Sequence, residues 1–241
     1  MSQTQNADKT KKRLWLALGV LLFALIAVIG VLAQQQSDKP AAAPEAGTAA
    51  EAGAQRPLSE LARRVEGDPY AIGPVDAPVV IIEFADFRCH YCGVFATETF
   101  PALVSEFVDS GDVRVEWHDA PVLGPGSVTS ATAAAAAAAQ GQFWAYNEAL
   151  YAALPEHEQD WTRDELIAIA AGIPAIDAEA FAAALDDPAT QQGVEQRGGQ
   201  ARSIGVTGTP TFIVGNQVLQ GAQPIDAFRT AIAAELAQAK G

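Results

Sequence analysis

Residues 78–92 read Pro78-Val-Val-Ile-Ile-Glu-Phe-Ala-Asp-Phe-Arg-Cys-His-Tyr-Cys92, an apolar run that leads into two cysteines. The run is short, rich in β-branched residues and interrupted only by Glu83. This pattern is typical of a strand buried on both faces, as in the centre of a parallel sheet. After Cys89, apolar residues from Val94 to Val108 recur at helical spacing. The sequence therefore predicts a strand that passes almost directly into a helix, with the cysteine pair at the junction.

The segment after this junction predicts a second strand. Pro101 should kink the helix, and Gly111 should end it. Residues Val113–Trp117 then alternate between apolar and polar side chains, as in a strand. A strand, a helix and a second parallel strand form a βαβ unit, whose crossover is expected to be right-handed.

The rest of the chain predicts a helical insert and a return to α/β structure. The insert covers about residues 127–204, and its Thr162–Glu165 segment reads as a capping box. A hairpin over residues 211–220 and a last helix that begins at Pro224 follow. We therefore expect one α/β domain over residues 58–241, in the order β-α-β, helical insert, β-β-α.

The first 57 residues predict a membrane anchor and a linker. Residues 14–33 carry no charge, and as a helix they would span about 30 Å, the hydrocarbon thickness of a bilayer. The basic segment 1–13 should stay in the cytoplasm, which places the remaining chain outside the cell membrane. Residues 34–57 are rich in Ala, Gln, Glu, Gly and Pro, as in a flexible linker. A cleaved signal peptide is the alternative, although its apolar core usually has only roughly 7–15 residues.

Composition narrows the classes of function. The formal net charge of −14 makes nucleic acid an improbable partner. The chain has 2 cysteines, separated only by His90 and Tyr91, so no other disulfide can form within it. A zinc site is a poor interpretation of the cysteine pair, because such a site needs about four ligands and the chain offers few histidines to complete them. Haem attachment needs a histidine directly after the second cysteine, but Gly93 stands there. A purely structural disulfide is a further alternative, although closing so short a loop would stabilise the fold little.

A cysteine at the first turn of a helix faces unpaired N–H groups and the positive end of the helix dipole, which favour the thiolate. We therefore expect Cys89 to be the reactive thiol and Cys92, one turn further, to be more buried. A protonated His90 would stabilise the reduced form and make the disulfide a stronger oxidant, whereas a neutral, exposed His90 would not. Tyr91 is interpreted as a substrate contact. Glu83 could lie beneath Cys92 and accept or relay its proton, or it could reach solvent at the strand end.

Three segments resemble DsbA-type disulfide oxidoreductases. Glu83–Cys92 resembles their active-site strand and helix start, and Gly205–Phe212 resembles the loop whose cis-proline faces the cysteine pair. Gly141–Tyr146 is similar to part of their helical insert, and the likeness runs in order from about Asp76 to Leu236. The resemblance implies a thioredoxin-like fold with an inserted helical subdomain, here preceded by one transmembrane helix.

The resemblance also implies roles for individual residues. Cys89 would be the nucleophile, Cys92 the resolving thiol and Glu83 the buried acid, while Thr209 and a cis Pro210 would hold the substrate backbone. The only cofactor would be the redox-active disulfide itself, with no metal.

The implied reaction oxidises cysteine pairs in exported proteins. By analogy, a quinone-linked membrane reoxidase would restore the disulfide, and the lipid bilayer would hold residues 14–33. The dipeptide between the cysteines departs from the family, because the best-known oxidases carry Pro then His there. A disulfide reductase or isomerase of the same fold, or a non-catalytic thioredoxin-like subunit of a membrane complex, are therefore alternatives.

Overall fold

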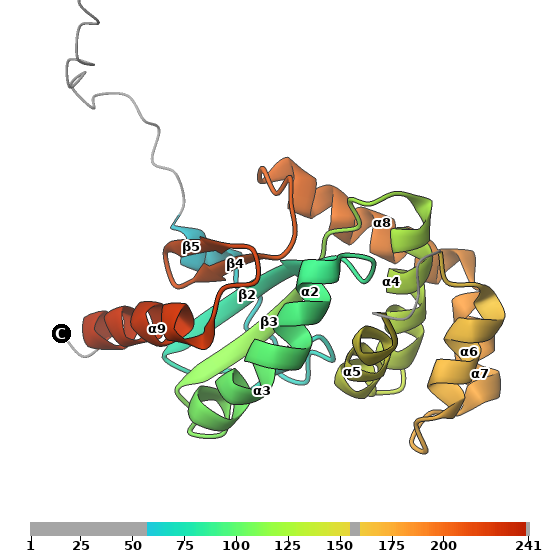
Figure 1. Ribbon diagram of the computed structural model, residues 1–241, viewed down its shortest axis with the longest axis horizontal. Helices are drawn as coiled ribbons and strands as arrows, with labels where there is room; N and C mark the ends of the chain where they lie inside the picture. Colours follow the sequence, from blue (N-terminus) through green and yellow to red (C-terminus); the bar gives the residue numbers. More distant parts are fainter. Residues whose placement is uncertain (1–56, 155–159, 240–241) are drawn as a thin grey trace, which may run out of the picture. The chain divides into compact units, whose positions relative to one another are not determined.

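The computed structural model describes residues 57–154 and 160–239, which fold around a five-stranded mixed sheet (Figure 1). Its strands are ordered β1-β3-β2-β4-β5 and comprise β1 (Ala71–Ile72), β2 (Val79–Ala85), β3 (Val113–Asp119), β4 (Thr211–Val214) and β5 (Gln217–Gln220). Strand β2 is buried along its whole length, parallel to β3 and antiparallel to β4. The predicted central strand and βαβ unit are confirmed, because the apolar run is enclosed on both faces and both edges.

The helix after β2 is interrupted around Pro101. It consists of α2 (His90–Val94) and α3 (Phe100–Leu103), each followed by a π-helical turn. In the first of these turns the Phe100 N–H donates to Phe95 O, five residues back. A proline cannot donate the usual helical hydrogen bond, and a wide turn next to it accommodates that loss.

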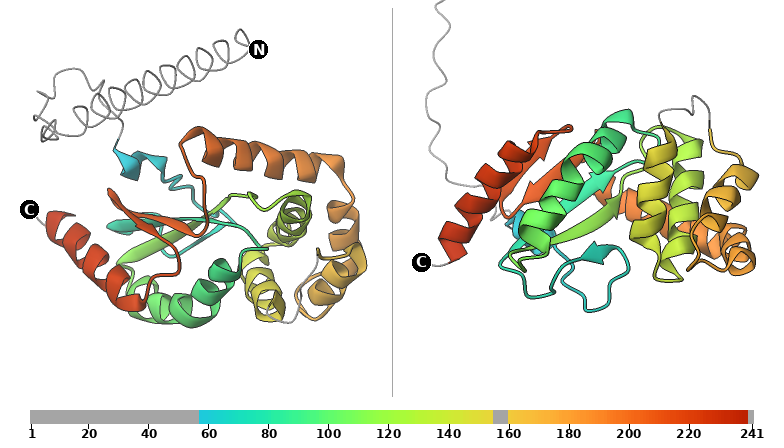
Figure 2. Two further views of the ribbon diagram at one scale, coloured as in Figure 1. Left: turned by 45° about the horizontal axis from the view of Figure 1, so that its top comes forward. Right: turned by 60° about the horizontal axis from the view of Figure 1, so that its bottom comes forward.

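The helical insert comprises α4 (Pro125–Ala138), α5 (Phe143–Ala153), α6 (Arg163–Ala171), α7 (Ala178–Leu185) and α8 (Pro188–Ser203). The capping box predicted at Thr162 is present, with the Glu165 N–H donating to the Thr162 side chain. Helix α4 is buried along most of its length because its small alanine side chains let α7 and α8 pack closely. Figure 2 shows α4 to α7 gathered at one end of the sheet, beside the helix that carries the cysteines, whereas α8 runs back and packs against β3.

The chain returns through the predicted β4–β5 hairpin to α9 (Ile225–Ala239). Gly215 has a positive φ of 58° in the hairpin turn, a conformation that glycine adopts without strain. Helices α2, α3 and α9 cover one face of the sheet, where Phe95, Phe212 and Phe228 pack together. The opposite face holds a second apolar cluster that includes Phe84 and Ile213.

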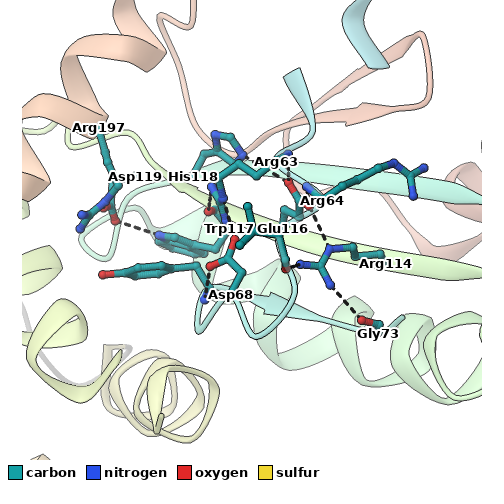
Figure 3. A network of polar contacts seen from close by, with 12 residues as sticks. Arg63, Arg64, Asp68, Gly73, Arg114, Glu116, Trp117, His118, Asp119 and Arg197 are labelled. Carbon is teal, nitrogen blue, oxygen red and sulfur yellow. Dashed lines mark hydrogen bonds and ion pairs between the residues drawn. The ribbon is translucent and has the colours of Figure 1, made fainter. Parts of the chain in front are cut away.

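An N-terminal strap, residues 58–72, crosses this opposite face and was not predicted from the sequence. It contains the 3-10 turn η1 (Leu58–Leu61) and β1. Figure 3 shows how the fully buried Glu116 of β3 holds it, by accepting the backbone N–H groups of Arg63 at 2.6 Å and Arg64 at 2.9 Å. Burial alone would raise the pKa of Glu116, but hydrogen bonds from His118, the Arg63 amide and Arg114 hold it well below its usual range.

The predicted basic segment, transmembrane helix and nearly all of the linker lie before residue 57, outside the described residues. Within residues 57–154 and 160–239, no helix has the length and apolar character needed to cross a membrane.

Candidate active site

The end of β2 and the start of α2 place the two cysteines. Three residues separate β2 from Cys89, and the Cys89 N–H donates to the carbonyl of Asp86 at 2.9 Å. Cys89 precedes the first helical residue, and its own carbonyl accepts the N–H groups of Cys92 and Gly93. Both cysteines are free thiols in this structure. The strand-to-helix junction predicted from the sequence is therefore confirmed.

The pKa of Cys89 is lowered from 9.0 to about 6. The largest cause is a hydrogen bond from the Cys92 thiol, and the backbone N–H groups of Cys92 and Tyr91 add to it against the opposing effect of burial. A cysteine with such a pKa is mostly a thiolate at neutral pH, which is the form that attacks and leaves in thiol–disulfide exchange.

Cys92 has the opposite character. It is fully buried, whereas Cys89 retains 7% of its surface. Burial raises the pKa of Cys92 well above its usual value, and the nearby charges of Cys89 and Glu83 add to the effect. The pair thus combines one acidic thiol near the surface with one protonated thiol in the interior, as predicted from their positions.

Glu83 is buried in the central strand and does not reach solvent. It lies between Trp117 and Phe212 on the neighbouring strands. Side chains alternate along a strand, so Glu83 shares the face of Ile81, the face that α2 covers. Burial raises its pKa to about 8, and its charge is close enough to influence the pKa of Cys92.

The cis-proline loop lies against Cys89. The Thr209–Pro210 peptide bond is cis, and the Cys89 thiol donates to the Thr209 carbonyl at 3.3 Å. The Gly221 N–H donates to the Pro210 carbonyl at 2.8 Å, which ties the loop to the end of β5. Residues 120 positions apart in sequence are thereby brought into contact, as the resemblance implied.

His90 and Tyr91 both point outward from the first turn of α2. Both are exposed, with Tyr91 at 62%, and their rings meet edge to face with centroids 5.5 Å apart. The two side chains therefore form part of the surface that a substrate approaching Cys89 would meet.

Asp86 organises the active-site turn, a role that was not predicted from the sequence. Its buried carboxylate accepts the N–H groups of Arg88, Val122 and Leu123 at 2.9–3.0 Å. Tyr151 of the helical insert donates its hydroxyl to the Asp86 carbonyl. The signal in the sequence was weak, because every partner of Asp86 except Arg88 lies 36 or more residues away.

Comparisons with known proteins agree with this geometry. A family model described as "Thioredoxin" matches residues 65–234. The "Disulfide bond formation protein D" of Bacillus subtilis is 29% identical over 175 residues, which cover 71% of this chain and 78% of that protein.

Two crystal structures are similar in fold. Oxidised BdbD from Bacillus subtilis matches with a TM-score of 0.64 at 29% identity, and the match covers 73% of this chain and 94% of the BdbD chain. Wolbachia pipientis alpha-DsbA1 has a TM-score of 0.63 at 20% identity, with coverages of 75% and 96%. The second likeness supports the fold alone.

Proposed function

Because the chain belongs to the thioredoxin family and is a DsbA-type thiol–disulfide oxidoreductase, we propose that it oxidises cysteine pairs in exported proteins. The observation that carries this direction is the contrast within the pair, an acidic Cys89 beside a protonated Cys92. A disulfide becomes more oxidising when its reduced form is stabilised as a thiolate.

The proposed reaction runs in two exchanges. A substrate thiolate attacks Cys89 Sγ of the oxidised pair, the Cys89–Cys92 bond breaks, and Cys92 leaves as a thiolate that takes up a proton. A second substrate thiolate then attacks the substrate sulfur of the mixed disulfide, and Cys89 leaves as a thiolate. Two electrons pass from the substrate to the enzyme, so the substrate gains a disulfide and the enzyme is left reduced.

We propose that Glu83 supplies or accepts the proton of Cys92 in these steps. Its position on the face that α2 covers and its pKa of about 8 support that role, because a group with such a pKa can exchange a proton near neutral pH. Thr209 and Pro210 are proposed to hold the substrate backbone beside Cys89, and Tyr91 to provide an apolar contact. His90 is proposed to adjust the stability of the thiolate through its charge.

We propose that the domain works outside the cytoplasm, anchored in the cell membrane by residues 14–33 with the N-terminus inside. The support is the sequence: 20 residues without a charge follow a basic segment. A membrane reoxidase linked to quinones would accept the two electrons from the reduced pair. In this proposal the Cys89–Cys92 disulfide is itself the redox cofactor.

One feature favours a second direction. The dipeptide His90-Tyr91 departs from the Pro-His of the best-known oxidases, so a reductase or isomerase is the alternative. Oxidation of a reduced, unfolded test protein distinguishes the classes of function. We expect the oxidised full chain to form disulfides in that protein and Cys89→Ser to form none. Retention of the cellular role by Cys89→Ser would instead indicate a non-catalytic subunit.

A further inference from the structure

Helix α5 of the insert carries two fully buried tyrosines that use their hydroxyl groups differently. Tyr146 donates to the Leu166 carbonyl of α6 at 3.2 Å, and its ring packs against Phe181 of α7, so it holds the insert together. Tyr151, on the same helix, reaches outside the insert. Its hydroxyl donates at 3.1 Å to the carbonyl of Asp86, in the turn between β2 and α2.

The ring of Tyr151 lies between the insert and the helix that carries the cysteines. It stacks on Phe87, the residue after Asp86, with ring centroids 5.2 Å apart. A Cβ atom built on Gly93, directly after Cys92, would lie 3.5 Å from a ring carbon of Tyr151, so the ring also lies against α2. Helices α5 and α2 pack together at this place (Figure 1). The hydroxyl is therefore held in a fixed position relative to the active-site turn.

The backbone of Asp86 contacts both cysteines. Its carbonyl accepts the Cys89 N–H at 2.9 Å in addition to the Tyr151 hydroxyl, so both lone pairs of that oxygen are used. Burial raises the pKa of Cys92, and a hydrogen bond from the Asp86 N–H opposes this effect. A displacement of Asp86 would therefore change the surroundings of both sulfur atoms.

The Tyr151 hydroxyl also favours the thiolate of Cys89 electrostatically. A carbonyl oxygen carries a partial negative charge, whose effect on a neighbouring group is stronger inside a protein than in water. A donor bound to that oxygen offsets part of the charge, so the carbonyl opposes a nearby thiolate less. Burial, together with the charges of Cys92 and Glu83, raises the pKa of Tyr151 well above its usual value, so the hydroxyl remains a donor throughout the reaction.

We propose that Tyr151 is a positioning residue for the thiol–disulfide exchange: by holding the Asp86 carbonyl, it keeps the active-site turn in place and stabilises the Cys89 thiolate. The helical insert would thereby help to set how oxidising the pair is. The inference rests on the proposed function for the redox role of the pair, and it holds for exchange in either direction.

Tyr151→Phe and Tyr146→Phe form a matched pair, because each removes one buried hydroxyl from α5 and leaves the ring in place. Equilibration of each full-length variant with glutathione gives the redox equilibrium constant. One hydrogen bond corresponds to about a three- to tenfold change in an equilibrium constant, so Tyr151→Phe should be less oxidising than the wild type by that factor, or about 15–30 mV. Tyr146→Phe should match the wild type, although both variants should lose similar stability in urea.

The pH profile of the reaction of Cys89 with iodoacetamide supplies a second measurement. Tyr151→Phe should raise the pKa of Cys89 by about 0.5–1, whereas Tyr146→Phe should leave it unchanged. An unchanged or more oxidising couple in Tyr151→Phe, or equal shifts in both variants, would overturn the proposal, because the hydroxyl would then have only a structural role. A wild-type potential near that of thioredoxin would instead overturn the proposed oxidase and would leave the role of Tyr151 standing.

Discussion

The lowered pKa of Cys89 makes the stability of the reduced protein depend on pH, and Cys89→Ser should remove that dependence. The folded protein releases the thiol proton at a pKa of about 6, against 9.0 for an unperturbed cysteine. Ionisation therefore stabilises the folded state. The contribution is fully present above pH 9 and is lost as the pH falls through 6.

The size of the effect follows from these two values. Proton linkage gives about 0.4 kcal/mol at pH 6, about 1.4 kcal/mol at pH 7 and about 2.7 kcal/mol at pH 8. Between pH 6 and pH 8, the reduced wild type should therefore gain about 2.3 kcal/mol of unfolding free energy relative to Cys89→Ser. Glu83 titrates in both proteins, so its contribution largely cancels in the comparison.

Urea unfolding under reducing conditions, at pH 6, 7 and 8, measures this difference. The oxidised wild type is the control, because neither sulfur can ionise in a disulfide, and it should show no such gain over the same pH range. Parallel stability curves for the reduced wild type and Cys89→Ser would refute the reasoning, because Cys89 would then ionise equally in the folded and unfolded states.

Three further substitutions test the environment of the pair. Burial raises the pKa of Glu83 from its ordinary value of 4.5 to about 8, so the folded state keeps a proton that the unfolded chain loses as the pH rises above 4.5. Glu83→Gln should therefore stabilise the protein by up to about 3 kcal/mol at pH 7 and hardly at all at pH 4. Urea titration at the two pH values checks this, and an equal effect at both would contradict it. Asp86→Ala removes the acceptor of three backbone N–H groups and should cost about 2–4 kcal/mol of unfolding free energy. Thermal melting near neutral pH measures this loss, and a change under ~0.5 kcal/mol would show that water replaces the carboxylate. Glu116→Ala removes the ion-pair partner of the buried Arg114 and frees the amides of Arg63 and Arg64, so a cost of about 3–5 kcal/mol of unfolding free energy is expected. Hydrogen exchange at those two amides should become faster, and unchanged exchange would contradict the holding role.

The sequence predicted those parts of the fold that depend on local pattern. Residues 79–85 formed the central strand, as expected for a short apolar run rich in β-branched residues. Thr162 capped α6 because its partner Glu165 is three residues away. The N-terminal strap was not predicted, because β1 has only 2 residues and because the strap is held at Arg63 and Arg64 by Glu116, more than 50 residues further along the chain.

The candidate site divides in the same way. The position of Cys89 at a helix start followed from the spacing of apolar residues, and the greater burial of Cys92 followed from that position. The contact between Cys89 and the Thr209 carbonyl followed only from the family resemblance, because no local pattern relates two segments 120 residues apart. The three amides bound by Asp86 include two from another loop, which a single sequence does not reveal.

The reduction potential of the Cys89–Cys92 couple, measured by equilibration of the full chain with glutathione, tests the central claim most directly. At pH 7 the ionisation of Cys89 stabilises the reduced form by about 1.4 kcal/mol, which makes the couple more oxidising by about 30 mV than the same pair with an unperturbed thiol. An oxidase predicts a potential between about −120 and −200 mV, in the range of proteins that donate disulfides. A value near about −270 mV, that of thioredoxin, would contradict the proposed direction and assign the chain to the reductases.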